Sequence, residues 1–220
     1  MWDGLHPALE GAGHRVAAPD LPGPAPELGF DMWARRVLGL VDGLFVPVGC
    51  SMGGYLIFEL WRQARERIPA LALVDTRATP DTAEQREARE DAIRLLGEAG
   101  RGAFWEDLAP RLFAADADPA VVARARQIAL EQPVTGLVAA QETIRDRVDS
   151  RPTLATIDVP VLVAVGEEDG MTPPADAAAM AAAVDGARLV RVPSAGHLSP
   201  FERPDEVAKD LVPFLAEVSA

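Results

Sequence analysis

The stretch that decides the fold is residues 46–54, which read Val46-Pro47-Val48-Gly49-Cys50-Ser51-Met52-Gly53-Gly54. Its first half is apolar and β-branched, as in a buried strand, and the residues after Ser51 have the apolar spacing of a helix. A serine between two glycines at a strand-to-helix junction indicates a sharp turn that exposes the hydroxyl. Serine is also preferred as a plain helix N-cap, which is the alternative interpretation. We predict that Ser51 is a nucleophile at the end of a strand.

Around this stretch, short β-rich apolar runs alternate with helical patterns. The strand-like runs are residues 15–19, 44–49, 70–74, 161–166 and 188–192, and the helical patterns lie near residues 5–10, 31–41, 52–65, 175–184 and 204–218. Strands that alternate with helices are typical of a parallel sheet with crossover helices. The sequence therefore predicts the α/β class, with a mostly parallel sheet.

Residues 79–149 interrupt this alternation, because they contain no strand-like run and are rich in Glu, Arg, Ala and Leu. We interpret residues 79–153 as a helical cap inserted into a core of residues 1–78 and 154–220. A cap is expected over the carboxyl edge of the sheet, where ligands bind in open α/β folds. Its apolar side chains predict either a substrate pocket or the cap's own packing face. The candidate substrate-binding residues are Phe104, Trp105, Leu108 and Phe113.

Two other predicted strands run into loops with polar side chains. The strand at 161–166 leads into Glu167-Glu168-Asp169-Gly170, and the strand at 188–192 leads into Pro193-Ser194-Ala195-Gly196-His197. Because parallel strands end at one edge of a sheet, both loops are expected beside Ser51. A serine hydroxyl needs a base, and the base is oriented by a third group. We predict His197 as the base and Asp169 as the acid, with Glu168 as the alternative acid.

Composition argues against several other function classes. The 21 basic and 34 acidic residues give a net charge of −13, which repels a polyanion such as nucleic acid. The single cysteine, Cys50, has no partner for an internal disulfide, and one cysteine with three histidines does not offer the ligands of a typical zinc site. We expect neither a metal nor an organic cofactor.

The sequence also gives no sign of a membrane partner. No apolar run approaches the roughly 18 residues that a membrane helix requires, and the N-terminus lacks the basic and apolar regions of a signal peptide. We expect a soluble, cytoplasmic protein whose partner is a small molecule. Its oligomeric state stays open.

Three motifs belong together in this sequence. They are Gly49-Cys50-Ser51-Met52-Gly53-Gly54, Gly166-Glu167-Glu168-Asp169-Gly170-Met171-Thr172-Pro173 and Ala195-Gly196-His197-Leu198-Ser199-Pro200-Phe201-Glu202-Arg203-Pro204. With them the chain resembles the α/β-hydrolase superfamily, and within it the branch of small esterases and 3-oxoadipate enol-lactonases. The resemblance implies Ser51 as nucleophile, Asp169 as acid and His197 as base. It also implies the backbone N–H of Met52 as one oxyanion donor.

The front of the chain departs from the family pattern. Family members begin with strands whose third member ends in a His-Gly type loop that supplies the second oxyanion donor, whereas this chain starts at what resembles the following helix. Losing one such donor typically costs about 10²–10³ in rate. We expect an N-terminally truncated sheet, in which either residues 15–19 pair directly with residues 44–49 or the natural chain begins upstream of Met1.

These observations predict hydrolysis of a small carboxylic ester or lactone through an acyl-enzyme. Cys50 lies next to the predicted nucleophile, but its side chain is expected to point into the core rather than to react. The alternative is a non-catalytic binding protein of the same fold, or an inactive remnant that lacks the second oxyanion donor.

Overall fold

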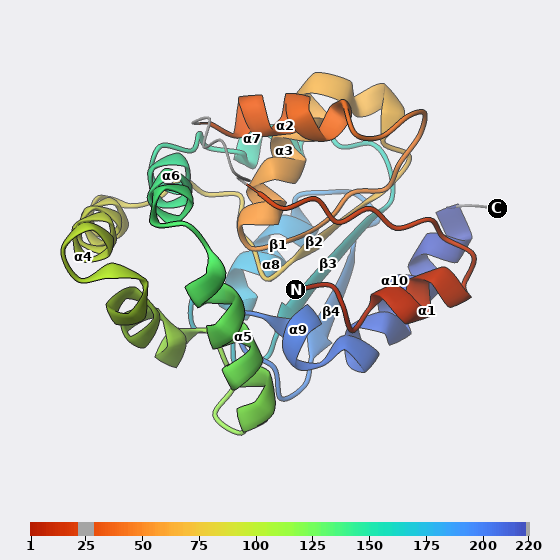
Figure 1. Ribbon diagram of the computed structural model, residues 1–220. Helices are drawn as coiled ribbons and strands as arrows, with labels where there is room; N and C mark the ends of the chain where they lie inside the picture. The colour runs from red at the N-terminus through yellow and green to blue at the C-terminus, as the bar shows by residue number, and fades with distance from the viewer. Residues whose placement is uncertain (22–28, 219–220) are drawn as a thin grey trace.

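A computed structural model describes residues 1–21 and 29–218 of the chain (Figure 1). The strands of these residues form one parallel sheet in the order β1-β2-β3-β4. They are β1 (Val48–Cys50), β2 (Leu71–Val74), β3 (Val161–Gly166) and β4 (Arg188–Val192). The predicted α/β class with a parallel sheet is therefore confirmed.

Helices cover both faces of the sheet. Those of the core are α1 (His6–Gly11), α2 (Phe30–Leu38), α3 (Met52–Ala64), α8 (Pro174–Ala182), α9 (Ser199–Glu202) and α10 (Pro204–Val218), with a 3₁₀ turn η1 (Arg65–Arg67). Side chains alternate along a strand, so Leu71 and Leu73 of β2 pack towards α2, α3 and α8, whereas Ala70 and Ala72 pack towards α1 and α10. The sheet is thus the middle layer of three.

The turn from β1 into α3 is tight, and it determines where Ser51 points. Ser51 has φ 51° and ψ −112°, a conformation that few non-glycine residues adopt. A Cβ at Gly49 would lie 2.4 Å from the backbone of Gly53, and one at Gly54 would lie 2.4 Å from the side chain of Thr76. At Gly53 a Cβ would meet no atom within 4 Å. Gly49 and Gly54, rather than Gly53, are therefore the glycines that close packing requires.

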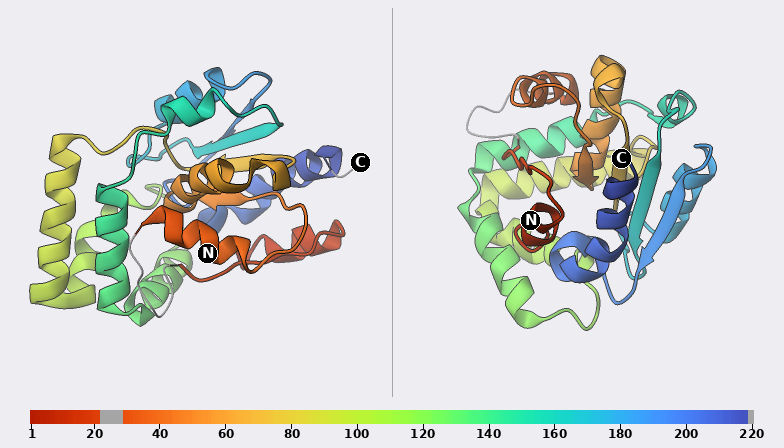
Figure 2. Two further views of the ribbon diagram at one scale, coloured as in Figure 1. Left: turned by 90° about the horizontal axis from the view of Figure 1, so that it is seen from above. Right: turned by 90° about the vertical axis from the view of Figure 1, so that its right-hand side faces the viewer.

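Between β2 and β3 the described chain forms helices only. They are α4 (Ala83–Leu108), η2 (Ala109–Arg111), α5 (Pro119–Glu131), α6 (Val134–Arg145) and the short α7 (Arg151–Leu154). Thr82 and Gln85 form a capping box that starts α4, and Gly100, with φ 77°, breaks that helix in two. Helices α4 and α6 pack side by side at one end of the molecule (Figure 2).

A buried ion pair joins the two connections between this helical region and the core. Arg147 donates to Asp81 at 2.6 Å, and both side chains are almost fully buried. Asp81 also accepts from Arg89 of α4, at 3.2 Å. The Arg147 guanidinium lies 4.4 Å from the centre of the Tyr55 ring of α3. Leaving either charge buried without its partner costs several kcal/mol, so the network holds the helices over the core.

The predicted strand at residues 15–19 is wrong, because those residues are irregular in the structure. Strand β1 is also shorter than the predicted 44–49 and forms one edge of the sheet. Residues 15–18 line a groove of about 210 Å³ together with Val46 and Val48, and Leu211 and Leu215 of α10 line it as well. Because a strand forms only where a neighbouring backbone is within hydrogen-bonding distance, residues 15–19 stay irregular beside β1.

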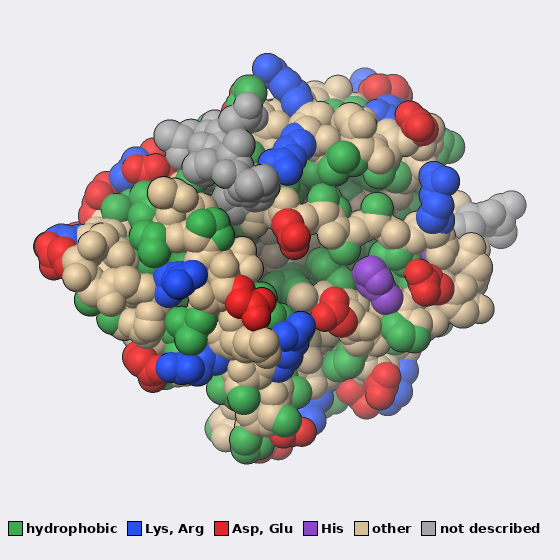
Figure 3. All heavy atoms as spheres, viewed as in Figure 1, with side chains coloured by type: hydrophobic (Ala, Val, Ile, Leu, Met, Phe, Trp, Pro, Cys, Tyr) green, Lys and Arg blue, Asp and Glu red, His purple; other side chains and the backbone are tan. Residues whose placement is uncertain are grey.

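The surface carries both signs of charge. Figure 3 shows acidic and basic side chains interspersed over one face, with hydrophobic side chains between them. Over residues 1–21 and 29–218, none of the helices combines the length and the apolar character needed to cross a bilayer.

Candidate active site

The three predicted site residues meet at the carboxyl edge of the sheet. Ser51 directly follows β1, Asp169 lies in the loop after β3, and His197 lies in the loop after β4. His197 Nε2 is 2.7 Å from Ser51 Oγ, and His197 Nδ1 is 2.9 Å from Asp169 Oδ2. Asp169 and His197 are each only 2% exposed. The structure therefore brings together an ordered chain of hydroxyl, imidazole and carboxylate.

Asp169 is fixed by donors from its own loop. Its Oδ1 accepts the backbone N–H groups of Met171 and Thr172 at 2.8 and 2.9 Å, and its Oδ2 accepts the Thr172 hydroxyl at 2.6 Å. Burial alone would raise the pKa of the Asp169 carboxyl, but hydrogen bonds from His197 and Thr172 lower it below its ordinary value. An ionised Asp169 accepts a hydrogen bond from Nδ1–H of the imidazole, which leaves Nε2 free to accept a hydrogen bond from the serine hydroxyl.

Glu168, the alternative acid, is placed elsewhere. It is exposed, and its Oε2 accepts the backbone N–H of Ala115 at 3.0 Å. It therefore ties the acid loop to the helical cap, and the contact with His197 is made by Asp169.

The loop that carries His197 is held by the cap and by a second buried carboxylate. The backbone N–H of His197 donates to the carbonyl of Leu112 at 2.9 Å. Glu202 accepts the N–H of Gly196 at 2.8 Å and that of Ala114 at 2.9 Å. Burial raises the pKa of Glu202, against the lowering effect of these backbone donors. Residues 112–114 thus contact the loop that carries the imidazole.

The predicted oxyanion donor lies at the start of α3. Met52 is the first residue of that helix, directly after Ser51, so its N–H has no carbonyl four residues earlier within the helix. The first turn of a helix carries partial positive charge, which favours a negative oxygen beside it. The position suits the role that the sequence predicts for this N–H.

A cleft of about 500 Å³ contains both Ser51 and His197. Phe104 and Leu108, two of the predicted substrate-binding residues, line it because they are four residues apart on one face of α4. The other walls are mostly polar, and include Arg77, Asp81, Gln85, Arg89, Arg111 and Gln141. The predicted apolar pocket is therefore only one side of a mixed cleft.

Trp105 and Phe113 do not line this cleft. Trp105 packs with Leu112 and with Ala125 of α5, and its ring centre is 6.1 Å from that of Phe113. Trp105 follows Phe104 directly, so it is turned about 100° around the helix, away from Ser51. These two residues lie in a hydrophobic cluster that also contains Met171, Leu198 and Phe201.

Cys50 is buried, at 5% exposure, although it precedes Ser51. Its Sγ lies 3.8 Å from Asp75 Oδ2 and 3.8 Å from the carbonyl oxygen of His197. Burial, and then the nearby charges of Asp75 and Asp169, raise the pKa of the thiol well above its ordinary value. The thiol points into the core, as expected. In the described part of the chain, no group of three or more His, Cys, Asp or Glu side chains is arranged to hold a metal ion.

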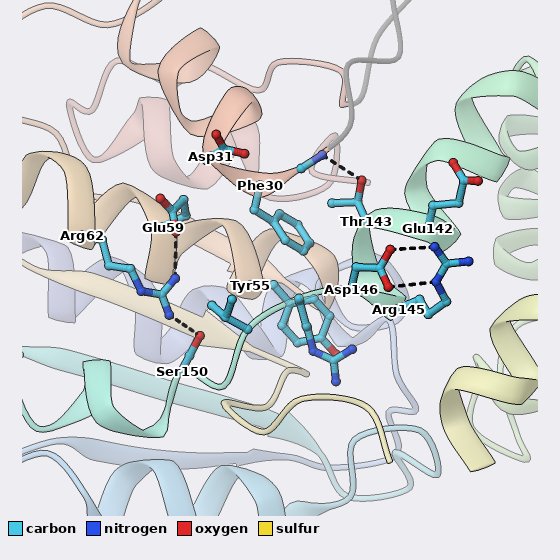
Figure 4. Close-up of a pocket in the computed structure, with 13 residues that line it drawn as sticks. Phe30, Asp31, Tyr55, Glu59, Arg62, Glu142, Thr143, Arg145, Asp146 and Ser150 are labelled. Atoms are coloured by element: carbon cyan, nitrogen blue, oxygen red, sulfur yellow. Dashed lines mark hydrogen bonds and ion pairs between the residues drawn. The ribbon is translucent and has the colours of Figure 1, made fainter. Parts of the chain in front are cut away.

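A second cavity, of about 470 Å³, lies between α2, α3 and α6 (Figure 4). Two ion pairs lie in its lining, Arg62 with Glu59 and Arg145 with Asp146. Tyr55 lines both this cavity and the catalytic cleft. The candidate nucleophile and base both open onto the cleft, which is therefore the candidate active site.

A model of the alpha/beta hydrolase family matches residues 1–210. The chain belongs to this family. It is similar to a thermophilic esterase from Thermogutta terrifontis, solved with malate bound, at 33% identity and a TM-score of 0.92, over 100% of this chain and 85% of that one. It is also similar to an enol-lactonase from Burkholderia xenovorans LB400, at 29% identity and a TM-score of 0.82, over 98% and 85% of the two chains.

A curated relative points to the same part of the alpha/beta hydrolase family. The pimeloyl-[acyl-carrier protein] methyl ester esterase of Aromatoleum aromaticum is 28% identical over 226 residues, which cover 94% of this chain and 90% of the relative. The predicted resemblance to α/β hydrolases of the esterase and enol-lactonase type is therefore confirmed.

Sequence reasoning missed three residues that support the site in this hydrolase. Thr172 and Glu202 fall within the quoted motifs, but nothing local shows that they would contact Asp169 and Gly196. Asp75 is fully buried directly after β2. A charged residue that ends an apolar run at the carboxyl edge of the sheet is the signal that could have revealed it.

Proposed function

We propose that this alpha/beta hydrolase is a serine hydrolase that cleaves a small carboxylic ester or lactone through an acyl-enzyme. The observation that carries the proposal is the 2.7 Å contact between Ser51 Oγ and His197 Nε2, with Asp169 2.9 Å from the other ring nitrogen. These are the distances over which a base takes a proton from a hydroxyl and an acid orients that base.

In the proposed reaction Ser51 Oγ attacks the carbonyl carbon while its proton passes to His197 Nε2. The carbonyl oxygen becomes an oxyanion beside the N–H of Met52, at the positive end of α3. When the tetrahedral intermediate collapses, the protonated imidazole gives its proton to the departing alkoxide. Water then attacks the acyl-enzyme with His197 again as base, and the acid leaves with Ser51 regenerated. Asp169 stays ionised and holds the imidazole throughout.

The relatives support this choice of substrate class. The similar proteins are by name an esterase, an enol-lactonase and a methyl ester esterase, all of which act on carboxylic esters in open or cyclic form. The cleft of about 500 Å³ favours small substrates, because drug-sized ligand pockets fall at about 300–1,000 Å³. Phe104 and Leu108 would contact the apolar part of the substrate.

The test compares the wild type with Ser51→Ala on nitrophenyl esters of increasing acyl length and on simple lactones. We expect the variant to lose kcat by a factor on the order of 10⁴ or more, because the nucleophile is removed while the fold is kept. Ser150→Ala is the matched control, since the Ser150 hydroxyl accepts from Arg62 at the second cavity. A Ser51→Ala variant that keeps most of the wild-type rate would refute the assignment.

Labelling by a fluorophosphonate distinguishes the enzyme from a non-catalytic protein of the same fold. An activated serine takes up one label, seen as a mass increase that maps to Ser51, and Ser51→Ala takes up none. A wild-type protein that is neither labelled nor active on any ester or lactone would favour the non-catalytic alternative.

A further inference from the structure

The side chain of Asp75 is a buried carboxylate that the proposed reaction does not use. Asp75 follows the last residue of β2 and is 0% exposed. Its φ of 45° is left-handed, a region that Asp and Asn enter more readily than other non-glycine residues. Strand β2 lies between β1 and β3, so its carboxyl end is next to the ends that lead to Ser51 and Asp169.

This carboxylate contacts all three segments that carry the candidate triad. Asp75 Oδ1 accepts the N–H of Gly166, at the end of β3, at 2.9 Å. Asp75 Oδ2 accepts the N–H and the hydroxyl of Ser199 at 2.8 and 2.7 Å, and Cys50 Sγ lies 3.8 Å from the same oxygen. Cys50 is next to Ser51, Gly166 is three residues before Asp169, and Ser199 is two residues after His197.

We propose that Asp75 is a positioning residue of the triad, whose single carboxylate fixes the segments of Ser51, Asp169 and His197 relative to one another. The proposal rests on the proposed function, because it concerns the same reaction. Asp75 acts through Gly166, Ser199 and Cys50 and does not touch the reacting atoms. A displacement of about 1 Å in a catalytic group can cost about 10² in rate, so a link between the three segments has a direct effect on kcat.

The chemistry of the contacts explains why a carboxylate occupies this position. Burying a charged group is costly unless donors satisfy it, and an apolar side chain would fill the same space without that cost. Burial raises the pKa of Asp75 to about 7, whereas the hydrogen bonds from Ser199 and Gly166 act to lower it. The donors come from two segments, Gly166 at the end of β3 and Ser199 in the His197 loop. A side chain with two acceptor oxygens can accept from both, whereas a smaller or apolar side chain cannot.

Asp75→Asn is the first test. Asparagine has the same shape and tolerates the same left-handed backbone, so the substitution changes the acceptor and leaves the turn intact. Its amide NH₂ replaces one acceptor oxygen and opposes the donors of either Gly166 or Ser199. We expect kcat to fall by up to about 10² with KM nearly unchanged, and fluorophosphonate labelling of Ser51 to slow in parallel.

Ser199→Ala is a milder second variant that decides the question if Asp75→Asn does not fold. It removes one hydroxyl donor and keeps the backbone N–H. The titratable groups that face Asp75 are Cys50, Asp169 and His197. In the wild type, the hydrogen bond from the Ser199 hydroxyl lowers the pKa of Asp75. Without this bond the pKa of Asp75 should rise. The decrease of kcat at low pH that reflects protonation of Asp75 should therefore begin at a higher pH in Ser199→Ala. A merely structural role would leave this profile in place.

Ile68→Ala is the stability control. Ile68 is 1% exposed and packs in the large core cluster before β2, at the opposite end of that strand from Asp75. The variant should unfold at a lower temperature than the wild type because a buried side chain is truncated. At temperatures where it stays folded, its kcat should be unchanged. If Asp75→Asn and Ser199→Ala keep the wild-type kcat and pH profile, or if Ile68→Ala loses kcat to the same extent, the positioning role is overturned.

A spectroscopic readout separates this proposal from the proposed function. The proton that His197 Nδ1 shares with Asp169 should give a low-field proton NMR signal, which we expect to weaken or shift in Asp75→Asn. If the wild type is inactive and Ser51 is not labelled, the proposed function is refuted. The NMR signal would still test whether Asp75 positions the His197 and Asp169 segments. If the wild type is active, and neither the NMR signal nor kcat changes in Asp75→Asn, only the positioning role of Asp75 is refuted.

Discussion

Replacing Asp169 by Asn tests the arrangement most directly. Asp169 accepts hydrogen bonds from Met171, from Thr172 through both its N–H and its hydroxyl, and from His197. With an amide in its place, the NH₂ group can donate to His197 Nδ1. The imidazole then carries its proton on Nε2, where it faces Ser51 and is unable to accept the hydroxyl proton.

The expected loss follows from this change of tautomer. In triad hydrolases the corresponding Asp-to-Asn change costs about 10⁴ in kcat. At about 1.4 kcal/mol per tenfold, that corresponds to between 5 and 6 kcal/mol, roughly, of transition-state stabilisation. The effect should appear in kcat and in kcat/KM equally, because the imidazole acts in the transition state rather than in substrate binding.

Glu168→Gln is the matched control, because it makes the same chemical change one residue away. Glu168 is exposed and accepts a single N–H from Ala115, which a glutamine oxygen can also accept. We expect kcat to stay within about threefold of the wild type, as for most surface substitutions. The assay is steady-state hydrolysis of a nitrophenyl ester, with circular dichroism to confirm folding. If Glu168→Gln is the more damaging change, the reasoning about the acid is refuted.

Three further predictions concern the surroundings of the site. Phe104 and Trp105 are both buried, so either alanine variant should lose about 3–5 kcal/mol of stability, as judged by chemical denaturation. Only Phe104 lines the cleft, so Phe104→Ala should also raise KM about tenfold; a rise in KM for Trp105→Ala alone would exchange their roles. Glu202→Gln keeps one acceptor oxygen for two buried N–H groups, so it should cost about 1–3 kcal/mol and lower kcat several-fold, and a wild-type melting temperature would contradict this. The pKa of Asp75 is raised from 3.8 to about 7, so between these pH values the folded state holds a proton that the unfolded chain has released. The free energy of unfolding should therefore fall by up to about 4 kcal/mol as the pH rises through this window. Chemical denaturation at pH 4–8 should show this slope in the wild type and not in Asp75→Asn.

The sequence was sufficient to place the candidate triad because each member depends on a local rule. Ser51, Asp169 and His197 each directly follow a recognisable strand or lie in the loop after one. Parallel strands end at the same edge, so the three residues meet without any knowledge of the detailed packing. The choice of Asp169 over Glu168 came from the motif, and the structure adds the reason: only Asp169 reaches His197, and its own loop turns donors towards it.

The error at residues 15–19 has a different origin. A short apolar run shows that a segment is compatible with a strand, but pairing depends on a neighbour that the run itself does not specify. The side chains of α1 and α10 lie along the groove beside β1, and residues 15–18 run on its other side. A local pattern thus indicated a strand and gave no information about whether a partner would lie beside it.

The buried carboxylates Asp75 and Glu202 could not be predicted from the sequence for a similar reason. The chain has 34 acidic residues, and most of them are solvated in any fold of this size. Asp75 differs because its partners Gly166 and Ser199 are 91 and 124 residues away, and Glu202 differs because it meets Ala114, 88 residues away. Such contacts exist only after the strands have been ordered and the cap has closed. Motifs can therefore indicate which groups are candidates to react, whereas the buried carboxylates that contact the loops around them are decided by tertiary packing.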